Sequence, residues 1–193
     1  MNPQAVNPTM KPPFPMHRLF AAIRPPTPVL DQLLAVEAGV AGARWQDDDQ
    51  LHLTLRFFGE VKAGQAEDIV LALEQVRARP FALTLQGVGH FERAGRAHTL
   101  WAGLAPSDEL LALQRTAESA ARRAGLAPEP RRFTPHITLA RLNTASGPVL
   151  PFLANHAALR GETWPVEAFD LMESTVAAAG ARYHTVRRYR LVE

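Results

Sequence analysis

The sequence has no cysteine and very little lysine: among its 193 residues the only lysines are Lys11 and Lys62. The absence of cysteine excludes disulfide bonds, thiolate catalysis and cysteine-ligated zinc sites. No apolar run approaches the ~20 residues that a membrane-spanning helix needs, and the N-terminus lacks the apolar core of a signal peptide. We therefore expect a cytoplasmic protein without a membrane segment.

Arginine supplies almost all of the positive charge. The 21 basic and 19 acidic residues give a formal net charge of +2 and a pI of about 9.5. Arginine is a better bidentate partner for phosphate than lysine is. We define a first arginine group (Arg115, Arg122, Arg123, Arg131, Arg132 and Arg141) and a second arginine group (Arg182, Arg187, Arg188 and Arg190). Two interpretations stay open: a solvated arginine-rich surface, or a surface that binds a phosphate-rich polymer.

Residues 51–60, LHLTLRFFGE, alternate between apolar and other side chains. This period of two predicts a β-strand with a core face and an opposite face. The predicted core face carries Leu51, Leu53, Leu55 and Phe57, and the opposite face carries His52, Thr54, Arg56 and Phe58. An imidazole and a hydroxyl are thereby expected side by side on the face turned away from the core.

The same pattern returns in residues 135–141, PHITLAR, where His136 and Thr138 alternate with Ile137 and Leu139. The chain thus contains His-apolar-Thr-apolar twice, with the two histidines 84 positions apart. A single copy is typical of a half-buried strand with a structural histidine, because short motifs often match by accident. Two copies in one chain indicate a functional site instead. The other histidines lack this setting and are assigned to structure or surface: His17, His90, His98, His156 and His184.

The remaining pattern predicts an α+β protein. Residues 1–16 hold five prolines and no periodicity, so we expect a disordered tail there, with Met16 as a potential native start, and one domain over residues 17–193. Helices are expected at 28–39 after Thr27 as N-cap, at 64–78, and between Ser107 and Gly125. Strands are expected at 18–23, 51–58, 81–85, 99–104, 135–141, 165–175 and 182–192, with a loop at 144–151. This order is typical of helices packed on antiparallel sheets.

The two motifs, with their flanks RFFGE and RFTPHITLAR, resemble the two-histidine phosphoesterase superfamily, and within it the RNA 2′,3′-cyclic phosphodiesterases, also called 2′-5′ RNA ligases. The likeness runs from about Arg18 to Val192 and includes RLFAAI near the start and LWAGL at 100–104. It extends to a closing segment with Phe169, Leu171, Ser174, Tyr183 and Leu191. The resemblance implies two pseudo-symmetric lobes, each an antiparallel sheet with packed helices, around a central groove that carries both motifs.

The residue types of the motifs fit the opening of a 2′,3′-cyclic phosphate. That reaction needs a base for the attacking water, an acid for the departing ribose oxygen and donors to the phosphate oxygens. Two imidazoles suit the first two roles because only histidine has an unperturbed pKa of about 6.5. The hydroxyls of Thr54 and Thr138 project to the side of the histidines and can donate to the phosphate. The resemblance implies His52 as proton donor and His136 as proton acceptor, whereas the residues alone do not distinguish the two roles.

Arg141 ends the second motif as His-x-x-x-x-Arg, and the resemblance implies that it is a further phosphate-binding residue. Strict alternation puts it instead on the core face with Ile137 and Leu139. We therefore expect that the strand ends or bulges at Ala140, or that Arg141 reaches around the edge. Arg56 falls on the face of the histidines by parity, but the resemblance implies no role for it, and it is left out of the predicted site.

The resemblance implies a metal-independent enzyme without a cofactor that opens the cyclic phosphate of RNA ends to a 2′-phosphate, with possible reversal to 2′-5′ ligation. We expect a monomer whose partners are RNA ends or small cyclic phosphates. Three alternatives stay open: a hydrolase of ADP-ribose cyclic phosphate or a cyclic nucleotide, a non-catalytic RNA-end-binding module, and a His/Asp metallo-hydrolase. The run Asp47-Asp48-Asp49 next to His52 bears on the last alternative, but blocks of like charge are usually solvated, and we expect a turn there.

Overall fold

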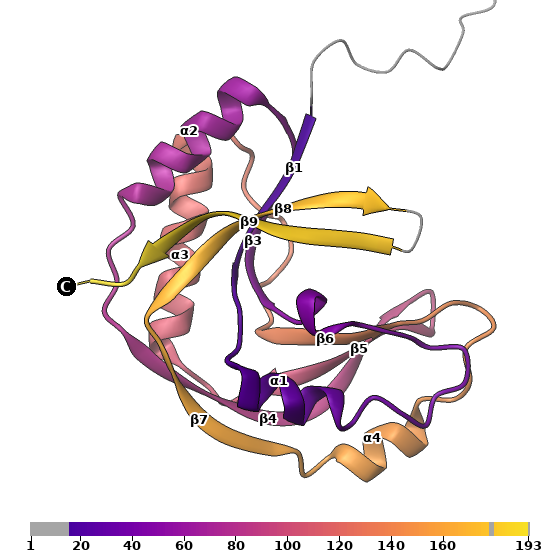
Figure 1. Ribbon diagram of the computed structural model, residues 1–193. Coiled ribbons are helices and arrows are strands. Elements are labelled where there is room, and N and C mark those ends of the chain that lie inside the picture. The colour runs from indigo at the N-terminus through magenta and orange to yellow at the C-terminus, as the bar shows by residue number, and fades with distance from the viewer. Residues whose placement is uncertain (1–15, 178–179, 193) are drawn as a thin grey trace, which may run out of the picture.

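A computed structural model of the chain describes residues 16–177 and 180–192 (Figure 1). Apart from Met16, which opens the first strand, the predicted tail lies outside the described residues. The strands are β1 (Met16–Ile23), β2 (Arg44–Trp45), β3 (Leu53–Lys62), β4 (Phe81–Arg93), β5 (Arg96–Leu104), β6 (His136–Arg141), β7 (Arg160–Val166), β8 (Ala168–Ala177) and β9 (Gly180–Arg190). The helices are α1 (Thr27–Leu34), α2 (Ala63–Glu74), α3 (Asp108–Arg123) and α4 (Leu150–His156), with a 3-10 turn at Asp48–Gln50. No described helix is long and apolar enough to cross a membrane.

The strands form one antiparallel sheet in the order β7-β4-β5-β6-β3-β1-β8-β9, and the short strand β2 pairs with the end of β6 at Ala140 and Arg141. The two motif strands, β3 and β6, are neighbours at the centre of this order. Their register contains a single residue pair, Leu53 with Ile137, whereas the other neighbouring strands pair over four or more positions. The sheet therefore consists of two halves that meet where the two motifs lie.

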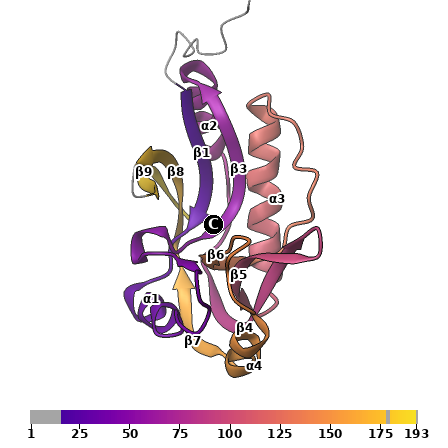
Figure 2. The ribbon, with the colours of Figure 1, turned by 90° about the vertical axis from the view of Figure 1, so that its right-hand side faces the viewer.

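Each half of the sheet has its own helices. Helices α2 and α3 pack against the half with β1 and β3, whereas α1 lies against β7 and α4 against β4 (Figures 1 and 2). The predicted α+β class, an antiparallel sheet with packed helices, is thus confirmed. The pseudo-symmetry of two lobes and the single domain over residues 17–193 stay predictions.

Local sequence explains where α3 and α4 begin, whereas Thr27, predicted as an N-cap, is the first residue of α1 and makes no capping hydrogen bond. The hydroxyl of Ser107 accepts a hydrogen bond of 3.1 Å from the backbone N–H of Leu110 and caps α3, as predicted. The loop predicted at residues 144–151 is wrong at its last two residues, because α4 begins at Leu150. Pro151 occupies the first turn of α4, where the missing N–H costs no hydrogen bond, and Phe152 is buried against Trp45.

Two bulges in β3 overturn the predicted faces of Arg56, Phe57 and Phe58, whereas Leu55 is in the core as predicted. The pairing with β1 shifts by one residue at Leu55 and again at Phe58, and each extra residue moves the following side chains to the other face. Phe57, predicted to be in the core, is 45% exposed, and Phe58, predicted on the opposite face, is buried. Arg56 pairs with Ala21 of the main core rather than facing the histidine side, so it points toward the helices.

Candidate functional site

The two motif histidines are held in the same way. The Nδ1 atom of His52 lies 2.6 Å from the carbonyl oxygen of Gln50, and the Nδ1 atom of His136 lies 2.7 Å from that of Thr134. A carbonyl oxygen can only accept a hydrogen bond, so each Nδ1 carries the proton. Both rings are therefore fixed in one tautomer, and each has its Nε2 atom left for a substrate.

The single pair between β3 and β6 brings the motifs together. With Leu53 opposite Ile137, the antiparallel register puts Thr54 beside His136, and His52 is the neighbour of Thr138 in the same way. Thr54 and His136 line one cavity, which agrees with this arrangement. The four predicted motif residues therefore lie together on one face at the junction of the two halves.

Arg141 joins these four residues because of another bulge. The pairing of β6 with β5 shifts by one residue at Leu139, one position before the expected bulge, so that Arg141 pairs with Thr99. Thr99 shares a strand face with Trp101, which pairs with Thr138, so Arg141 points toward the site. Its guanidinium donates a hydrogen bond of 3.0 Å to the hydroxyl of Thr99. All five predicted site residues thus belong to one cluster.

Both histidines are neutral at pH 7 in the unliganded protein. Burial lowers the pKa of His52 to about 4, against the hydrogen bond to Gln50, and the nearby His136, Arg141 and Arg24 lower it further. Burial also lowers the pKa of His136, and Arg141 adds to that effect. A bound anion would reverse both trends, since a nearby negative charge favours the protonated imidazole.

Aromatic rings that the sequence analysis did not assign to the site pack against both imidazoles. Phe20 and Tyr183 lie with ring centroids 4.8 and 5.2 Å from that of His52, and Phe91 lies 4.8 Å from that of His136. These residues come from β1, β9 and β4, which long-range pairing brings to the motifs. No local pattern distinguishes them from ordinary strand aromatics, and only Tyr183 and the RLFAAI segment carried a signal, through the resemblance.

Trp101 packs beside His136, and its indole ring lies against Gly89 of the neighbouring strand. Its ring centroid lies 6.3 Å from that of His136, and it pairs with Gly89 across β4 and β5. A Cβ atom on Gly89 would lie 2.3 Å from the indole ring. Gly89 therefore lets the indole lie directly on the β4 backbone.

A cavity of about 400 Å³ opens beside His136. Its wall combines aromatic, basic and polar side chains from β3, the β4–β5 hairpin, α3 and the segment before β6. The lining residues are Thr54, Leu55, Arg56, Phe57, Phe91, Glu92, His98, Gln114, Glu129, Arg131, Arg132, Phe133, Thr134 and His136. Such a mixture is typical of small-molecule sites.

Two carboxylates of the acidic run next to His52 form ion pairs with Arg24. Asp48 and Asp49 belong to the 3-10 turn, which Asp47 and Gln50 cap, and their carboxylates lie 3.8 and 3.3 Å from the guanidinium of Arg24. Within residues 16–177 and 180–192, no group of three His, Cys, Asp or Glu residues is arranged to hold a metal ion.

The members of the two arginine groups have different surroundings. In the first group, Arg131 and Arg132 line the cavity, whereas Arg123 donates a hydrogen bond to the carbonyl of Ala72. In the second group, Arg187 pairs with Glu74 at 2.6 Å and Arg188 with Asp170 at 2.8 Å. Arg123, Arg187 and Arg188 are therefore engaged by acceptors within the protein.

The chain is similar to known proteins over most of its length. A family model described as the 2′-5′ RNA ligase superfamily matches residues 16–177. The RNA 2′,3′-cyclic phosphodiesterase of Escherichia coli K12 is 31% identical over 182 residues, which cover 91% of this chain and 97% of that protein. The protein of the same name from Thermus thermophilus is 33% identical over 189 residues and 90% of each chain. A crystal structure of E. coli LigT complexed with 3′-AMP matches with a TM-score of 0.76 at 29% identity, covering 93% of this chain and 100% of that one.

Proposed function

Because the chain belongs to the 2′-5′ RNA ligase superfamily, we propose that it is an RNA 2′,3′-cyclic phosphodiesterase that leaves the phosphate on the 2′ oxygen. The observation that carries the proposal is the matched pair of imidazoles. Both hold their Nδ1 protons on backbone carbonyls and keep Nε2 for a substrate at the junction of β3 and β6. Relatives named for this activity, at 31% and 33% identity, support the same substrate class.

In the proposed reaction, a cyclic phosphate binds between the two imidazoles. His136 takes a proton from a water molecule at Nε2 while the water oxygen forms a bond to phosphorus. The bond from phosphorus to the 3′ oxygen breaks, and protonated His52 gives its Nε2 proton to that oxygen. The hydroxyls of Thr54 and Thr138 and the guanidinium of Arg141 donate to the non-bridging oxygens and stabilise their charge. Attack by a 5′-hydroxyl instead of water, with the same proton transfers, joins two RNA ends by a 2′-5′ bond.

The free protein must gain a proton before it can react in this way. His52 is the proposed acid, yet its pKa of about 4 keeps it neutral at pH 7. The charge of the bound phosphate raises the proton affinity of His52, so that binding and protonation are coupled. His136 is already neutral and can act as the base. These side chains supply every proton transfer in the scheme, and we propose that no metal takes part.

A second candidate substrate is a small cyclic nucleotide, and the cavity beside His136 favours it. A volume of about 400 Å³ holds one nucleoside, and Phe57, Phe91 and Phe133 provide surfaces for a base. Relative rates on the two substrates decide between them.

The test is hydrolysis of an oligonucleotide that ends in 2′,3′-cyclic phosphate, with EDTA present throughout. We expect a 2′-phosphate product from the wild type. His52→Ala and His136→Ala should each lose about 10²–10⁴ in rate while they keep the fold. A 3′-phosphate product contradicts the assigned direction of opening, and loss of activity in EDTA contradicts the metal-free scheme. Near wild-type turnover in either folded variant removes that histidine from the mechanism.

A further inference from the structure

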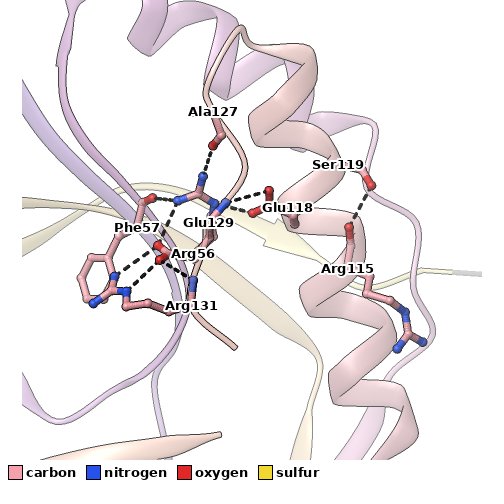
Figure 3. Close-up of polar contacts among 8 residues, drawn as sticks. All are labelled: Arg56, Phe57, Arg115, Glu118, Ser119, Ala127, Glu129 and Arg131. Atoms are coloured by element: carbon pink, nitrogen blue, oxygen red, sulfur yellow. Dashed lines mark hydrogen bonds and ion pairs between the residues drawn. The ribbon is translucent and has the colours of Figure 1, made fainter. Parts of the chain in front are cut away.

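Arg56 is a buried cation whose hydrogen-bonding groups are all directed at the protein. It follows Thr54 by two positions in β3 and is only 8% exposed. Its Nε atom lies 2.5 Å from a carboxylate oxygen of Glu118, and its terminal nitrogens donate to the carbonyls of Ala127 and Phe57 and to Glu129 (Figure 3). Two carboxylates and two carbonyls thus surround the guanidinium, which leaves it unsuited to bind a substrate phosphate.

The partners of Arg56 lie on α3 and on the segment that connects α3 to β6. In the described part of the chain, residues 127–135 of this segment form no helix or strand. The hydrogen bonds that tie the segment to the body of the protein come from Arg56, at Ala127 and Glu129, and from Glu118, which accepts the Glu129 N–H at 3.2 Å. The Glu129 carboxylate also binds the Arg131 guanidinium at 2.7 Å, which extends the network along the segment.

The same segment ends at the second histidine. The carbonyl of Thr134 accepts the Nδ1 proton of His136 and so sets the tautomer of that ring. Between Glu129 and Thr134, the side chains of Arg132 and Phe133 form part of the cavity wall. A residue of the first motif strand therefore secures the piece of chain that orients the histidine of the second motif.

We propose that Arg56 is a positioning residue that couples the two motifs. Through Ala127, Glu129 and Glu118 it holds the 127–134 segment, and through that segment it keeps His136 as the Nδ1–H tautomer with Nε2 directed at the substrate. The consequence for catalysis rests on the proposed function, in which His136 is the base. The consequence for the tautomer does not, because it is a property of the unliganded protein.

The geometry calls for arginine rather than lysine. The planar guanidinium has five donors, and here it donates hydrogen bonds to three acceptors and forms an ion pair with Glu118, so that its partners lie on β3, α3 and the 127–134 segment. A lysine ammonium is a compact point charge with three donors and cannot span the same set. Arg56→Lys therefore keeps the positive charge beside the carboxylates but cannot reach all the partners of the guanidinium. Glu129→Gln keeps the size of the Glu129 side chain but removes the charge that binds Arg56.

The first experiment reads the tautomer directly. Long-range ¹H–¹⁵N spectra of the imidazoles are recorded at pH 7 for the wild type, Arg56→Lys and Glu129→Gln. We expect Nδ1–H at both motif histidines in the wild type and a mixture of tautomers at His136 in both variants. His52 is an internal control, because its partner is the carbonyl of Gln50. Arg160→Lys on β7 and Glu67→Gln on α2, both exposed, are matched controls that should leave both rings unchanged.

The second experiment separates turnover from binding. In both variants we expect kcat on a 2′,3′-cyclic-phosphate substrate to fall roughly 10- to 100-fold through misplacement of the base. Affinity for inorganic phosphate should change by less than about twofold, because the threonines and Arg141 are unaltered. Folded variants that retain pure Nδ1–H at His136 overturn the proposal. Failure of both conservative variants to fold also overturns it, since Arg56 then holds the fold rather than His136. If the wild type is inactive on cyclic phosphates and the two variants still show the tautomer change at His136, only the proposed function is refuted.

Discussion

The neutral state of His52 predicts a specific loss of stability in acid. Folding lowers the pKa of this imidazole from its usual 6.5 to about 4, so between these values the unfolded chain binds a proton that the folded protein does not. The free energy of unfolding therefore decreases as the pH falls from 6.5 to 4, and it levels off below that range. Linkage with these two values gives a contribution of about 2 kcal/mol lost at pH 5 relative to pH 7.

Urea unfolding of the wild type and His52→Asn at pH 7, 6 and 5 measures this contribution. The asparagine amide can still donate to the Gln50 carbonyl but does not titrate. Groups that do not interact with His52 titrate alike in both proteins, so the difference between the two pH dependences reports His52 together with its coupling to His136. We expect the wild type to lose about 2 kcal/mol more than His52→Asn from pH 7 to pH 5. Parallel pH dependences would falsify the neutral, buried imidazole, and with it the need for phosphate to protonate the acid.

Three further outcomes are expected. The single-turnover rate on cyclic-phosphate RNA should be bell-shaped in pH, with apparent pKa values that belong to the coupled pair, and a single alkaline plateau in the presence of EDTA contradicts the paired histidines. Affinity for single-stranded RNA ends should fall about sevenfold from about 50 to 200 mM salt if two phosphates are contacted, and a flat dependence in filter binding means that the arginines near the cavity do not contact RNA. Gly89→Ala should lower the free energy of unfolding by about 1–3 kcal/mol through its clash with Trp101, whereas Gly64→Ala, which meets no atom within 4 Å, should not; equal melting temperatures for the two variants refute the close contact.

The repeated motif was predictable because it depends on adjacent residues alone. His52 and Thr54 lie before the first bulge of β3, and His136 and Thr138 lie before the bulge of β6. Strand alternation therefore applies to all four. It holds for Leu55, which is buried as predicted, and fails from Arg56 to Phe58, since a bulge depends on how two strands fit and leaves no mark in one of them. For Arg141, strict alternation predicted the core face, whereas a phosphate-binding role required the face of the histidines. A bulge at Leu139, one residue earlier than expected, puts Arg141 on the face of the histidines.

The rest of the site arises from pairing between distant segments. Phe20 reaches His52 from β1, and Tyr183 reaches it from β9. The role of Arg56 was missed for the same reason, because its partners on α3 and residues 127–129 are more than 60 positions away. The pattern within β3 suggested that Arg56 shared a face with the histidines, whereas its half-buried carboxylate partners require the opposite side.

The one-residue register between β3 and β6 has a mechanical consequence. Leu53 and Ile137 form the only residue pair between β3 and β6 in the described chain, and each is the immediate neighbour of a motif histidine. Both side chains are buried in the one hydrophobic core that spans the two halves. The spacing of the two imidazoles is therefore coupled directly to the packing of that core. Substitutions that loosen this pair should reduce turnover and the melting temperature together.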